Sequence, residues 1–439
     1  MCQAEKRDLR VGFAMEDITP DYTVCISGYG DDEIRRSEGI SDPIYLTCIA
    51  VSEGDETILL YTSDLLSISD WAAERLREKI SPETGIPGEK MFFGATHSHS
   101  GPLHYGDQVD AVRFRNTLQE AAVRIAKEAL ADRVPAQMLS VTKEVPGMNF
   151  IRHYRMEDGT CCGSNFGNWK QKILCHTHDT DPRLTLVRFA REGKTDVVMM
   201  NWQAHNDNVR EVGYYLVSSS YVGQVRKYFV EETGLNFAFF MGASGNQNAV
   251  TRIPEESHGL DWIGYGKKMA EIAVEAMEGL KPVTGCGIKT KRVMFEVNVD
   301  HSWDHMVKEA DEVFHTWKTI GKKEGDILGK QYNFTSSYQA RDIRARAKMD
   351  KTTILELNAF RIGDMGFVTS TNEVFSTVGK YVRANSPYET TFIITGNSRY
   401  LPCAEAYEYR SYESDTGLYA QGTAEKVAEK LARMLAEVK

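Results

Sequence analysis

Hydrophobic residues along the chain follow two spacings in turn, one typical of strands and one typical of helices. Short apolar or alternating segments predict strands at residues 9–15, 44–52, 56–62, 90–94, 184–189, 195–202, 237–241, 287–299, 354–362, 365–369 and 392–395. Apolar residues at helical spacing predict helices at residues 69–80, 110–131, 220–232, 260–278 and 423–437. Most connections are short, and no Pro/Gly/Ser-rich linker separates two cores. We therefore expect residues 1–439 to form one large mixed α/β domain, with mixed β-sheets flanked by helices.

Two segments interrupt this pattern. Residues 145–182 are glycine-rich and polar, which predicts loops. Residues 302–350 are highly charged at helical spacing, which predicts a charged helical excursion within the domain. The excursion either crosses over the functional site or presents a solvated face, and its charge favours the solvated face.

The composition limits the classes of partner. The chain has 52 Lys and Arg against 62 Asp and Glu, a formal net charge of −10, so we expect no nucleic-acid partner. No apolar run approaches the roughly 20 residues that a membrane-spanning helix needs, so we expect no integral membrane segment. The first residues lack the apolar core of a secretory signal, which predicts a cytoplasmic protein. The alternative is an exported lipoprotein, with Cys2 marking a trimmed acylation site.

Eight cysteines are scattered along the chain and do not form a disulfide framework. One group stands apart, because thiols and imidazoles of this kind hold structural zinc in other proteins. It consists of Cys161, Cys162, Cys175, His176 and His178. The spacing matches no standard zinc finger or ribbon, so a polar insertion loop is the favoured interpretation and a second metal site stays open.

The strongest chemical signal is the segment ATHSHSGP at residues 95–102. It follows the strand predicted at 90–94, and alternate side chains of a strand share a face, so His97 and His99 are expected to enter one cavity. The small residues around them leave room for a metal and a substrate. Imidazole is the commonest metal ligand and the usual proton carrier near neutral pH. A lone His-x-His is only moderately specific, since two polar residues closing a strand give the same pattern.

A metal site with two histidines needs further ligands, and two residues at strand ends qualify. His205 follows the strand at 195–202 and begins a polar run. Glu373 follows the strand at 365–369, where we expect a helix to start whose dipole favours the charged carboxylate. Taken singly, each is equally well explained as a strand-end polar residue or a helix cap.

Five motifs occur in a recognisable order. GFAMEDITP at 12–20, ATHSHSGP at 95–102, NWQAH at 201–205 and MGASGN at 241–246 precede YLPCAEAYEYRSYE at 400–413, which keeps two tyrosines twelve residues apart. Together they resemble the neutral ceramidase superfamily, the neutral/alkaline non-lysosomal ceramidases and their shorter bacterial relatives. The resemblance covers almost the whole chain and implies the fold of the N-terminal catalytic domain of that family.

The resemblance also implies a cofactor and a set of roles. In that superfamily one zinc ion, Zn(2+), is held by two histidines, a glutamate and a tyrosine, which correspond here to His97, His205, Glu373 and Tyr400. It implies His99 as the acid/base beside the zinc-bound water, with Arg152 and Tyr412 facing the carbonyl oxygen. The sequence around Arg152 departs from the family pattern. Such a site generates hydroxide near neutral pH and lets it attack an amide carbonyl.

Three departures bear on the substrate. Ceramidases proper are larger and carry an additional C-terminal β-rich domain. The family's Gly-Asn-x-Ser loop appears here as Gly245-Asn246-Gln247-Asn248, with Asn248 at the serine position. The charged stretch at 302–350 is not an apolar insertion helix. With Asn246, Asn248 and Trp202 as expected substrate contacts, we predict hydrolysis of an N-acyl bond in a small polar molecule other than ceramide.

Three alternatives stay open. The zinc site is equally suited to an ester or glycosidic C–O bond, because Trp202, Gln247 and Asn248 suit sugar hydroxyls. An amidohydrolase barrel also uses His-x-His, but there the motif follows the first strand, and no eightfold strand–helix rhythm is visible here. A non-catalytic binding protein with a closed four-ligand zinc is the third, with Tyr400 as the fourth ligand. The sequence indicates a small-molecule substrate without naming it, and gives no oligomeric state.

Overall fold

The computed structural model describes residues 8–30, 32, 34–164, 169–207 and 213–439. Cys2, on which the lipoprotein alternative depends, lies outside the described residues. Within the described ranges, no helix is both long and apolar enough to cross a membrane.

Two β-sheets form the centre of the molecule. The larger has nine strands, in the spatial order β14-β12-β11-β6-β1-β3-β4-β5, with β16 paired to β6. Their bounds are β1 (Leu9–Asp17), β3 (Tyr45–Glu53), β4 (Glu56–Ser63), β5 (Met91–Ala95), β6 (Val134–Glu144), β11 (Arg183–Arg191), β12 (Val197–Trp202), β14 (Asn236–Met241) and β16 (Lys281–Pro282). The smaller sheet has the order β17-β18-β19-β21, formed by β17 (Ile288–Asn298), β18 (Thr352–Ile362), β19 (Met365–Ser370) and β21 (Thr391–Thr395). Most neighbours are antiparallel, but β4–β5, β12–β14 and β19–β21 are parallel.

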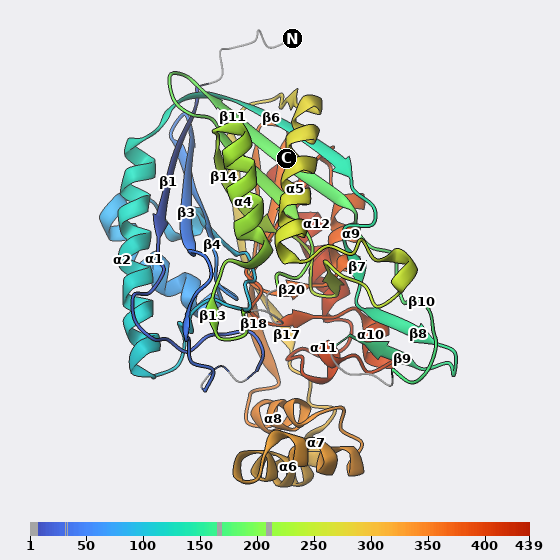
Figure 1. The fold of residues 1–439 in the computed structure, drawn as a ribbon. Helices are drawn as coiled ribbons and strands as arrows, with labels where there is room; N and C mark the ends of the chain where they lie inside the picture. Colours follow the sequence, from blue (N-terminus) through green and yellow to red (C-terminus); the bar gives the residue numbers. More distant parts are fainter. Residues whose placement is uncertain (1–7, 31, 33, 165–168, 208–212) are drawn as a thin grey trace.

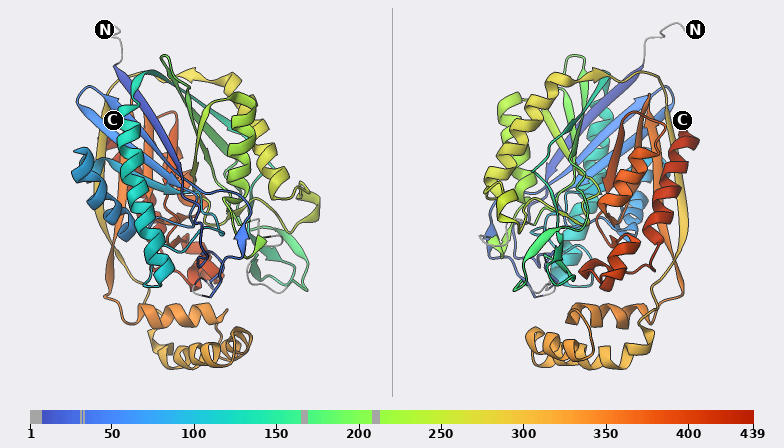
Figure 2. Two further views of the ribbon diagram at one scale, coloured as in Figure 1. Left: turned by 60° about the vertical axis from the view of Figure 1, so that its left-hand side comes forward. Right: turned by 90° about the vertical axis from the view of Figure 1, so that its right-hand side faces the viewer.

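The sheets face each other and helices cover their outer faces, which gives four layers (Figures 1 and 2). The larger sheet is covered by α1 (Asp70–Thr84), α2 (Val109–Ala131), α4 (Ser220–Thr233) and α5 (Trp262–Ala276). The smaller sheet is covered by α9 (Ser376–Ala384) and α12 (Thr423–Val438). Between the sheets, the rings of Phe92 and Phe360 stack with centroids 4.2 Å apart, inside a shared apolar core. The expected mixed α/β class is confirmed.

One long strand, β6, was not predicted from the sequence pattern. β6 pairs with β11 along the whole length of β11, yet most of its side chains are only half-buried. Because it buries little on either face, it shows no apolar run for a pattern to detect.

Shorter elements complete the fold: β2 (Gly39–Ile40), β7 (Phe150–Ile151), β8 (His153–Met156), β9 (Cys161–Gly163), β10 (Ile173–His176), β13 (Leu216–Val217), β15 (Gln247–Asn248), β20 (Glu373–Val374), β22 (Tyr400–Leu401), α10 (Ala404–Glu408) and α11 (Tyr412–Asp415).

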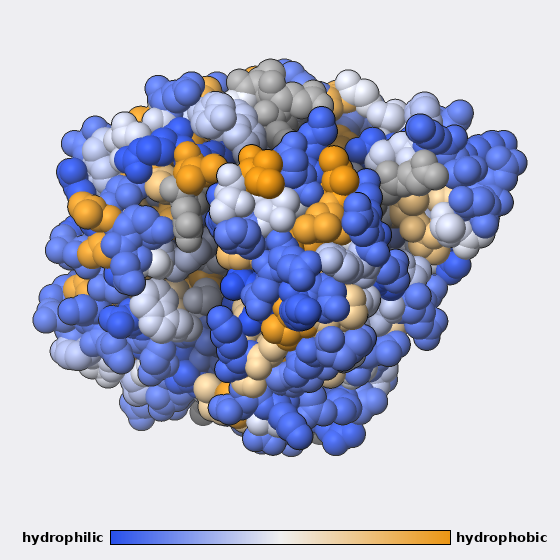
Figure 3. Space-filling view, turned by 90° about the horizontal axis from the view of Figure 1, so that it is seen from below, coloured by the Kyte–Doolittle hydropathy of each residue, from blue (hydrophilic) through white to orange (hydrophobic). Residues whose placement is uncertain are grey.

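The segment 302–350 forms three helices, as its spacing predicts: α6 (Val307–Thr319), α7 (Lys322–Gln331) and α8 (Ser337–Arg346). They pack around a small core of their own and project from one end of the molecule (Figure 1). Seen from that end, the surface is mainly hydrophilic with separate hydrophobic spots (Figure 3). The helices are more than a solvated face, however. The hydroxyl of Tyr338 on α8 donates to the carbonyl of Tyr29 at 3.1 Å, so α8 reaches the loops beneath the sheets.

Candidate metal centre

The sequence-predicted metal ligands gather at the carboxyl ends of strands, where α/β proteins bind their ligands. A glycine marks the place where three strands approach each other. A Cβ on Gly94 would lie 2.9 Å from the side chain of Ile394 on β21 and 3.5 Å from the ring of Phe240 on β14. Since β12 pairs with β14 and β19 pairs with β21, the loops that leave β5, β12, β19 and β21 start close together. They carry His97 after β5, His205 after β12, Glu373 after β19 and Tyr400 after β21.

The two histidines of the His-x-His motif do not lie on a strand. β5 ends at Ala95, and His97 has φ +61°, in the left-handed region that L-residues rarely adopt. This turn, rather than strand alternation, brings Nε2 of His99 to 3.2 Å from Nε2 of His97. Both imidazoles line one cavity, as expected, but the strand explanation for it is wrong.

Backbone carbonyls fix the orientation of two imidazoles. Nδ1 of His97 lies 2.8 Å from the carbonyl oxygen of Leu66, and Nδ1 of His205 lies 2.9 Å from that of Ser244. A carbonyl only accepts, so each Nδ1 carries the proton and each Nε2 presents a lone pair to the site. Burial lowers the pKa of His97 to about 4 and that of His205 well below its usual value, so both rings are neutral at pH 7.

Glu373 completes this arrangement. Its Oε2 lies 3.4 Å from Nε2 of both His97 and His205. Burial raises the pKa of Glu373 to about 8. The residue lies in the short strand β20, which pairs with Tyr400 on β22, and α9 begins only at Ser376. The expectation that Glu373 starts a helix is therefore wrong by three residues, and the parallel strand pairing positions the carboxylate instead.

The donor set fits a metal ion. In the described part of the chain, one group of three possible ligand side chains converges within 4.8 Å, namely His97, His99 and His205. Nε2 of His205 and Oε2 of Glu373 are buried without a hydrogen-bond partner in the structure. Buried acceptors without a donor are costly, and a cation is the partner that satisfies several of them at once. Glu373 is not part of that group of three histidines, although its Oε2 lies 3.4 Å from Nε2 of both His97 and His205.

A charged network stands behind this centre. Nη2 of Arg152 donates to the hydroxyl of Tyr400 at 3.1 Å, while Nε of Arg152 donates to Glu413 at 2.7 Å. Nε2 of His153 lies 2.8 Å from the other oxygen of Glu413. Burial opposes both charges, but Tyr400 and Glu413 raise the pKa of Arg152, and His153 and Arg152 hold the pKa of Glu413 well below its usual range. Arg152 is thus a fixed, buried cation behind the site. It is not among the residues that line the described cavity, so its expected contact with a carbonyl oxygen stays a prediction.

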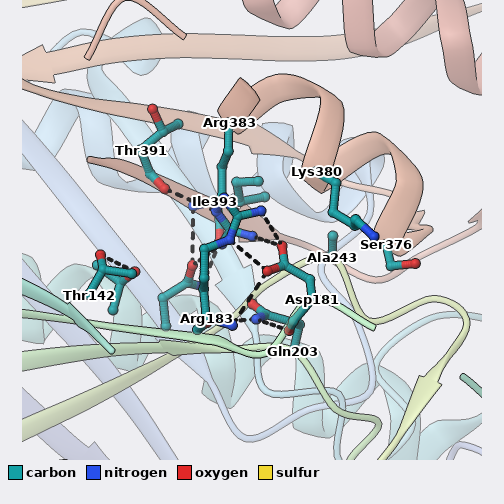
Figure 4. A network of polar contacts seen from close by, with 12 residues as sticks. Thr142, Asp181, Arg183, Gln203, Ala243, Ser376, Lys380, Arg383, Thr391 and Ile393 are labelled. Atoms are coloured by element: carbon teal, nitrogen blue, oxygen red, sulfur yellow. Dashed lines mark hydrogen bonds and ion pairs between the residues drawn. The ribbon is translucent and has the colours of Figure 1, made fainter. Parts of the chain in front are cut away.

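A second network ties α9 to the strand that delivers His205 (Figure 4). The buried guanidinium of Arg383 pairs with Asp181, and Asp181 also accepts from Nε of Arg183 at 2.7 Å. Nη2 of Arg383 donates at 3.1 Å to the side-chain oxygen of Asn201 on β12. The amide of Gln203, two residues before His205, donates to the Asp181 carbonyl at 2.7 Å. The Glu373 and His205 sides of the site are therefore held in one rigid frame.

The loop of His99 is fixed by a buried arginine. Nη1 of Arg35 donates to the carbonyl of His99 at 2.8 Å and to that of Ser27 at 3.0 Å. The His99 ring lies edge-on to Tyr29, with centroids 5.1 Å apart. Gly28 has φ +128°, and a Cβ there would lie 2.6 Å from Cα of His99, so only glycine fits. These contacts hold the imidazole against the cavity.

The cavity in front of the centre has a volume of about 500 Å³ and a mixed lining that is slightly more polar than apolar. His97, His99, Glu373 and Tyr400 form its floor, and Tyr412 stands beside them with its ring centroid 6.0 Å from that of Tyr400. Burial raises the pKa of Tyr412 to about 12, so its hydroxyl is a proton donor at neutral pH. Aspartate, serine and arginine side chains line other parts of it, together with apolar and aromatic residues that include Leu66, Trp71, Ile354, Leu418 and Tyr419.

The expected substrate contacts do not join this cavity. Trp202 is fully buried in the hydrophobic core and donates its indole N–H to Tyr265 at 3.0 Å, which corrects its assignment as a substrate residue. The side-chain oxygen of Asn246 accepts from the backbone N–H of Ser376 at 2.8 Å, so this residue anchors α9. Asn248 pairs through its backbone with Phe150 and is absent from the described cavity lining.

The cysteine and histidine group at 161–178 does not converge in the described part of the chain. Nε2 of His176 lies 2.8 Å from Glu256, and Nε2 of His178 lies 3.0 Å from Glu405. Cys161, Cys162 and Cys175 form no disulfide with another described cysteine. This geometry is that of a polar loop, the favoured interpretation.

Three residues around the centre had no assigned role in the sequence: Arg35, Glu413 and Arg399. Glu413 follows Tyr412 in the tyrosine motif, and that adjacency was the available signal. Arg35 is one arginine among many in the sequence, and nothing in its neighbourhood distinguishes it. Its role depends on contacts with residues 8 and 64 positions away.

Comparisons with known proteins give a fold. No family model matches the sequence, and no curated protein matches it. Among solved structures, neutral ceramidase from Pseudomonas aeruginosa superposes with a TM-score of 0.72 at 15% identity, covering 99% of this chain and 75% of that one. A ceramidase complexed with C2 superposes with a TM-score of 0.70 at 15% identity, covering 98% and 75%. The chain has the neutral ceramidase fold.

Proposed function

We propose that this protein is a zinc-dependent hydrolase that cleaves an amide (N-acyl) bond in a small polar substrate. The observation that carries the proposal is the buried convergence of two imidazole lone pairs and the carboxyl group of Glu373 beside a cavity, an arrangement in which a bound cation would favour the carboxylate form. The solved structures that share the fold are ceramidases, which supports amide hydrolysis as the reaction type.

His97, His205, Glu373 and Tyr400 are the residues that would hold the zinc ion. When bound, zinc lowers the pKa of its water to about 7 and polarises a carbonyl oxygen. The chain prepares the site by keeping both imidazoles neutral and oriented through Leu66 and Ser244.

Three further residues would transfer protons and stabilise the charge that develops on the carbonyl oxygen. His99 lies close enough to His97 to take a proton from an attacking water and return it to the leaving amine. Arg152 is held protonated by Glu413, and Tyr412 is neutral, so both are suited to donate hydrogen bonds to the carbonyl oxygen as it gains charge. Glu413 is a positioning residue, because it acts through Arg152.

The cavity lining supports a polar substrate over ceramide. Its walls carry several charged and hydroxyl side chains, and the helices beneath it present a mainly hydrophilic face (Figure 3). A long acyl chain needs an extended apolar groove, whereas this cavity places aspartate, serine and arginine side chains beside its apolar residues. The burial of Trp202 removes one expected substrate contact from both the amide and the C–O hypotheses, so it does not separate them.

A substrate panel with defined metal content tests the proposal. The protein is stripped with EDTA, reloaded with one equivalent of Zn²⁺, and assayed against matched short-chain N-acyl, ester and glycoside reporters. We expect hydrolysis of N-acyl reporters that disappears with EDTA and returns with zinc. Zinc-dependent cleavage confined to glycosides or esters would favour the C–O alternative. Stoichiometric zinc without turnover of any reporter would favour a binding protein.

A further inference from the structure

Two arginines from different parts of the chain line the cavity of the metal centre. Arg341 lies on α8 of the helical excursion, and Arg399 lies immediately before Tyr400. The carbonyl of Arg399 accepts from the backbone N–H of Glu373 at 2.7 Å. The backbone of Arg399 is therefore fixed next to two proposed metal ligands, and the residue lines the same cavity.

The two guanidinium groups differ in their partners. Arg341 makes a bidentate pair with Asp342, through contacts of 2.9 and 2.8 Å. Arg399 is exposed, and within the described ranges its guanidinium has neither an ion pair nor a hydrogen bond. The cavity also holds the carboxyl groups of Asp32 and Asp70, each of which accepts a hydrogen bond from a hydroxyl, and within the described ranges neither pairs with Arg399. Asp32 accepts from the hydroxyl of Tyr105 at 2.5 Å, and Asp70 accepts from the hydroxyl of Thr371 at 2.6 Å.

We propose that Arg399 binds an anionic group of the substrate, so that the N-acyl compound cleaved at this centre carries a carboxylate or a phosphate. The proposal rests on the proposed function and names its substrate class. Guanidinium binds both groups with paired N–H donors, and the contact gains strength where the ligand is partly withdrawn from water. An anion at Arg399 fixes one end of the substrate while the scissile carbonyl lies over the floor of the cavity.

The contact also gives specificity. A neutral analogue of the same shape leaves Arg399 without the partner that the anion supplies. A hydrogen bond to a charged group contributes enough to binding to predict a preference of about 10- to 100-fold for the anion over its neutral counterpart. If Arg399 is instead a solvated surface residue with no binding role, anionic and neutral ligands should bind equally well.

The test measures binding rather than turnover. Zinc-loaded protein is titrated by calorimetry with three hydroxamates that share a metal-binding head: succinic acid monohydroxamate, its neutral carboxamide analogue, and a phosphonate analogue of the same length. We expect at least one anionic compound to bind about 10-fold or more tightly than the carboxamide. The carboxylate and phosphonate arms identify which anion the site prefers.

Two variants connect the preference to one side chain. Arg399→Gln should remove the preference for the anion while leaving carboxamide affinity and zinc content unchanged. Arg433→Gln is the matched control, because Arg433 is an exposed arginine on α12 whose side chain is 75% exposed and pairs with Glu429. It should keep the wild-type preference.

The outcomes separate the two proposals. Equal affinity for charged and neutral hydroxamates in the zinc-loaded wild type, or an unchanged preference in Arg399→Gln, overturns the role of Arg399 and leaves the zinc hydrolase intact. A protein that retains no zinc and binds none of the hydroxamates overturns the proposed function, and the inference with it.

Discussion

Two regions of this protein contain histidines beside other metal-ligand residue types, and only one has the geometry of a metal centre. At the centre, His97 and His205 turn their protonated Nδ1 atoms to backbone carbonyls and present lone pairs to a shared point with Glu373. In the 161–178 loop, His176 and His178 each face a separate carboxylate. Residue types alone do not distinguish the two regions. The two regions are distinguished by the convergence of several hydrogen-bond acceptors that have no donor, which, among their described residues, occurs only at the centre.

The largest expected difference between the regions is in metal affinity. His97→Ala should lower zinc affinity by more than about 100-fold, since even the outer partners of metal ligands contribute about 10- to 100-fold. Activity should disappear with the metal. His176→Ala is the matched variant and should bind zinc as the wild type does. Competition with a fluorescent zinc chelator measures the zinc affinity of both variants. An equal loss of affinity in His97→Ala and His176→Ala would show that the two regions do not differ in metal binding.

His99 tests whether every histidine of the centre is a ligand. His99→Ala should keep stoichiometric zinc and lose about 10²- to 10⁴-fold in kcat, the usual contribution of a general acid–base group. Metal analysis of the purified variant, together with steady-state kinetics on an N-acyl reporter, gives both numbers. Zinc loss as severe as in His97→Ala would make His99 a ligand and remove the proposed acid–base group.

The two regions also contain comparable glutamates at different depths. Glu413 binds Arg152 and His153 in full burial, whereas Glu405 binds Arg155 and His178 with 43% of its side chain exposed. Glu413→Gln should cost about 3–5 kcal/mol of unfolding free energy, because it leaves a buried guanidinium without its counterion. Glu405→Gln should cost at most about 1 kcal/mol. Urea denaturation compares them, and equal costs would show that Arg152 does not depend on Glu413.

Much of the site follows from strand ends in the sequence. His97, His99, His205 and Glu373 each come soon after an apolar run, and the structure brings all four together. How the backbone brings these side chains together could not be predicted from the sequence. The positive φ of His97 could not be read from the residue type, because only a small fraction of histidines adopt it.

The substrate side was harder to predict for a physical reason. Trp202 ends an apolar strand, and a core tryptophan and a stacking tryptophan look alike at that position; its burial against Tyr265 appears only after folding. β6 was missed because half-buried strands carry no apolar run. Likewise, the charge of 302–350 gave no sign that Tyr338 and Arg341 reach the cavity region, since both lie among solvated residues in the sequence.

Zinc K-edge X-ray absorption on protein loaded with one equivalent of Zn²⁺ tests the central claim most directly. The account predicts a shell of nitrogen and oxygen scatterers at about 2.0–2.2 Å with imidazole outer-shell features, because no sulfur lies among the proposed ligands. A sulfur shell at about 2.3 Å would place the ion in the cysteine-containing loop instead and contradict the account.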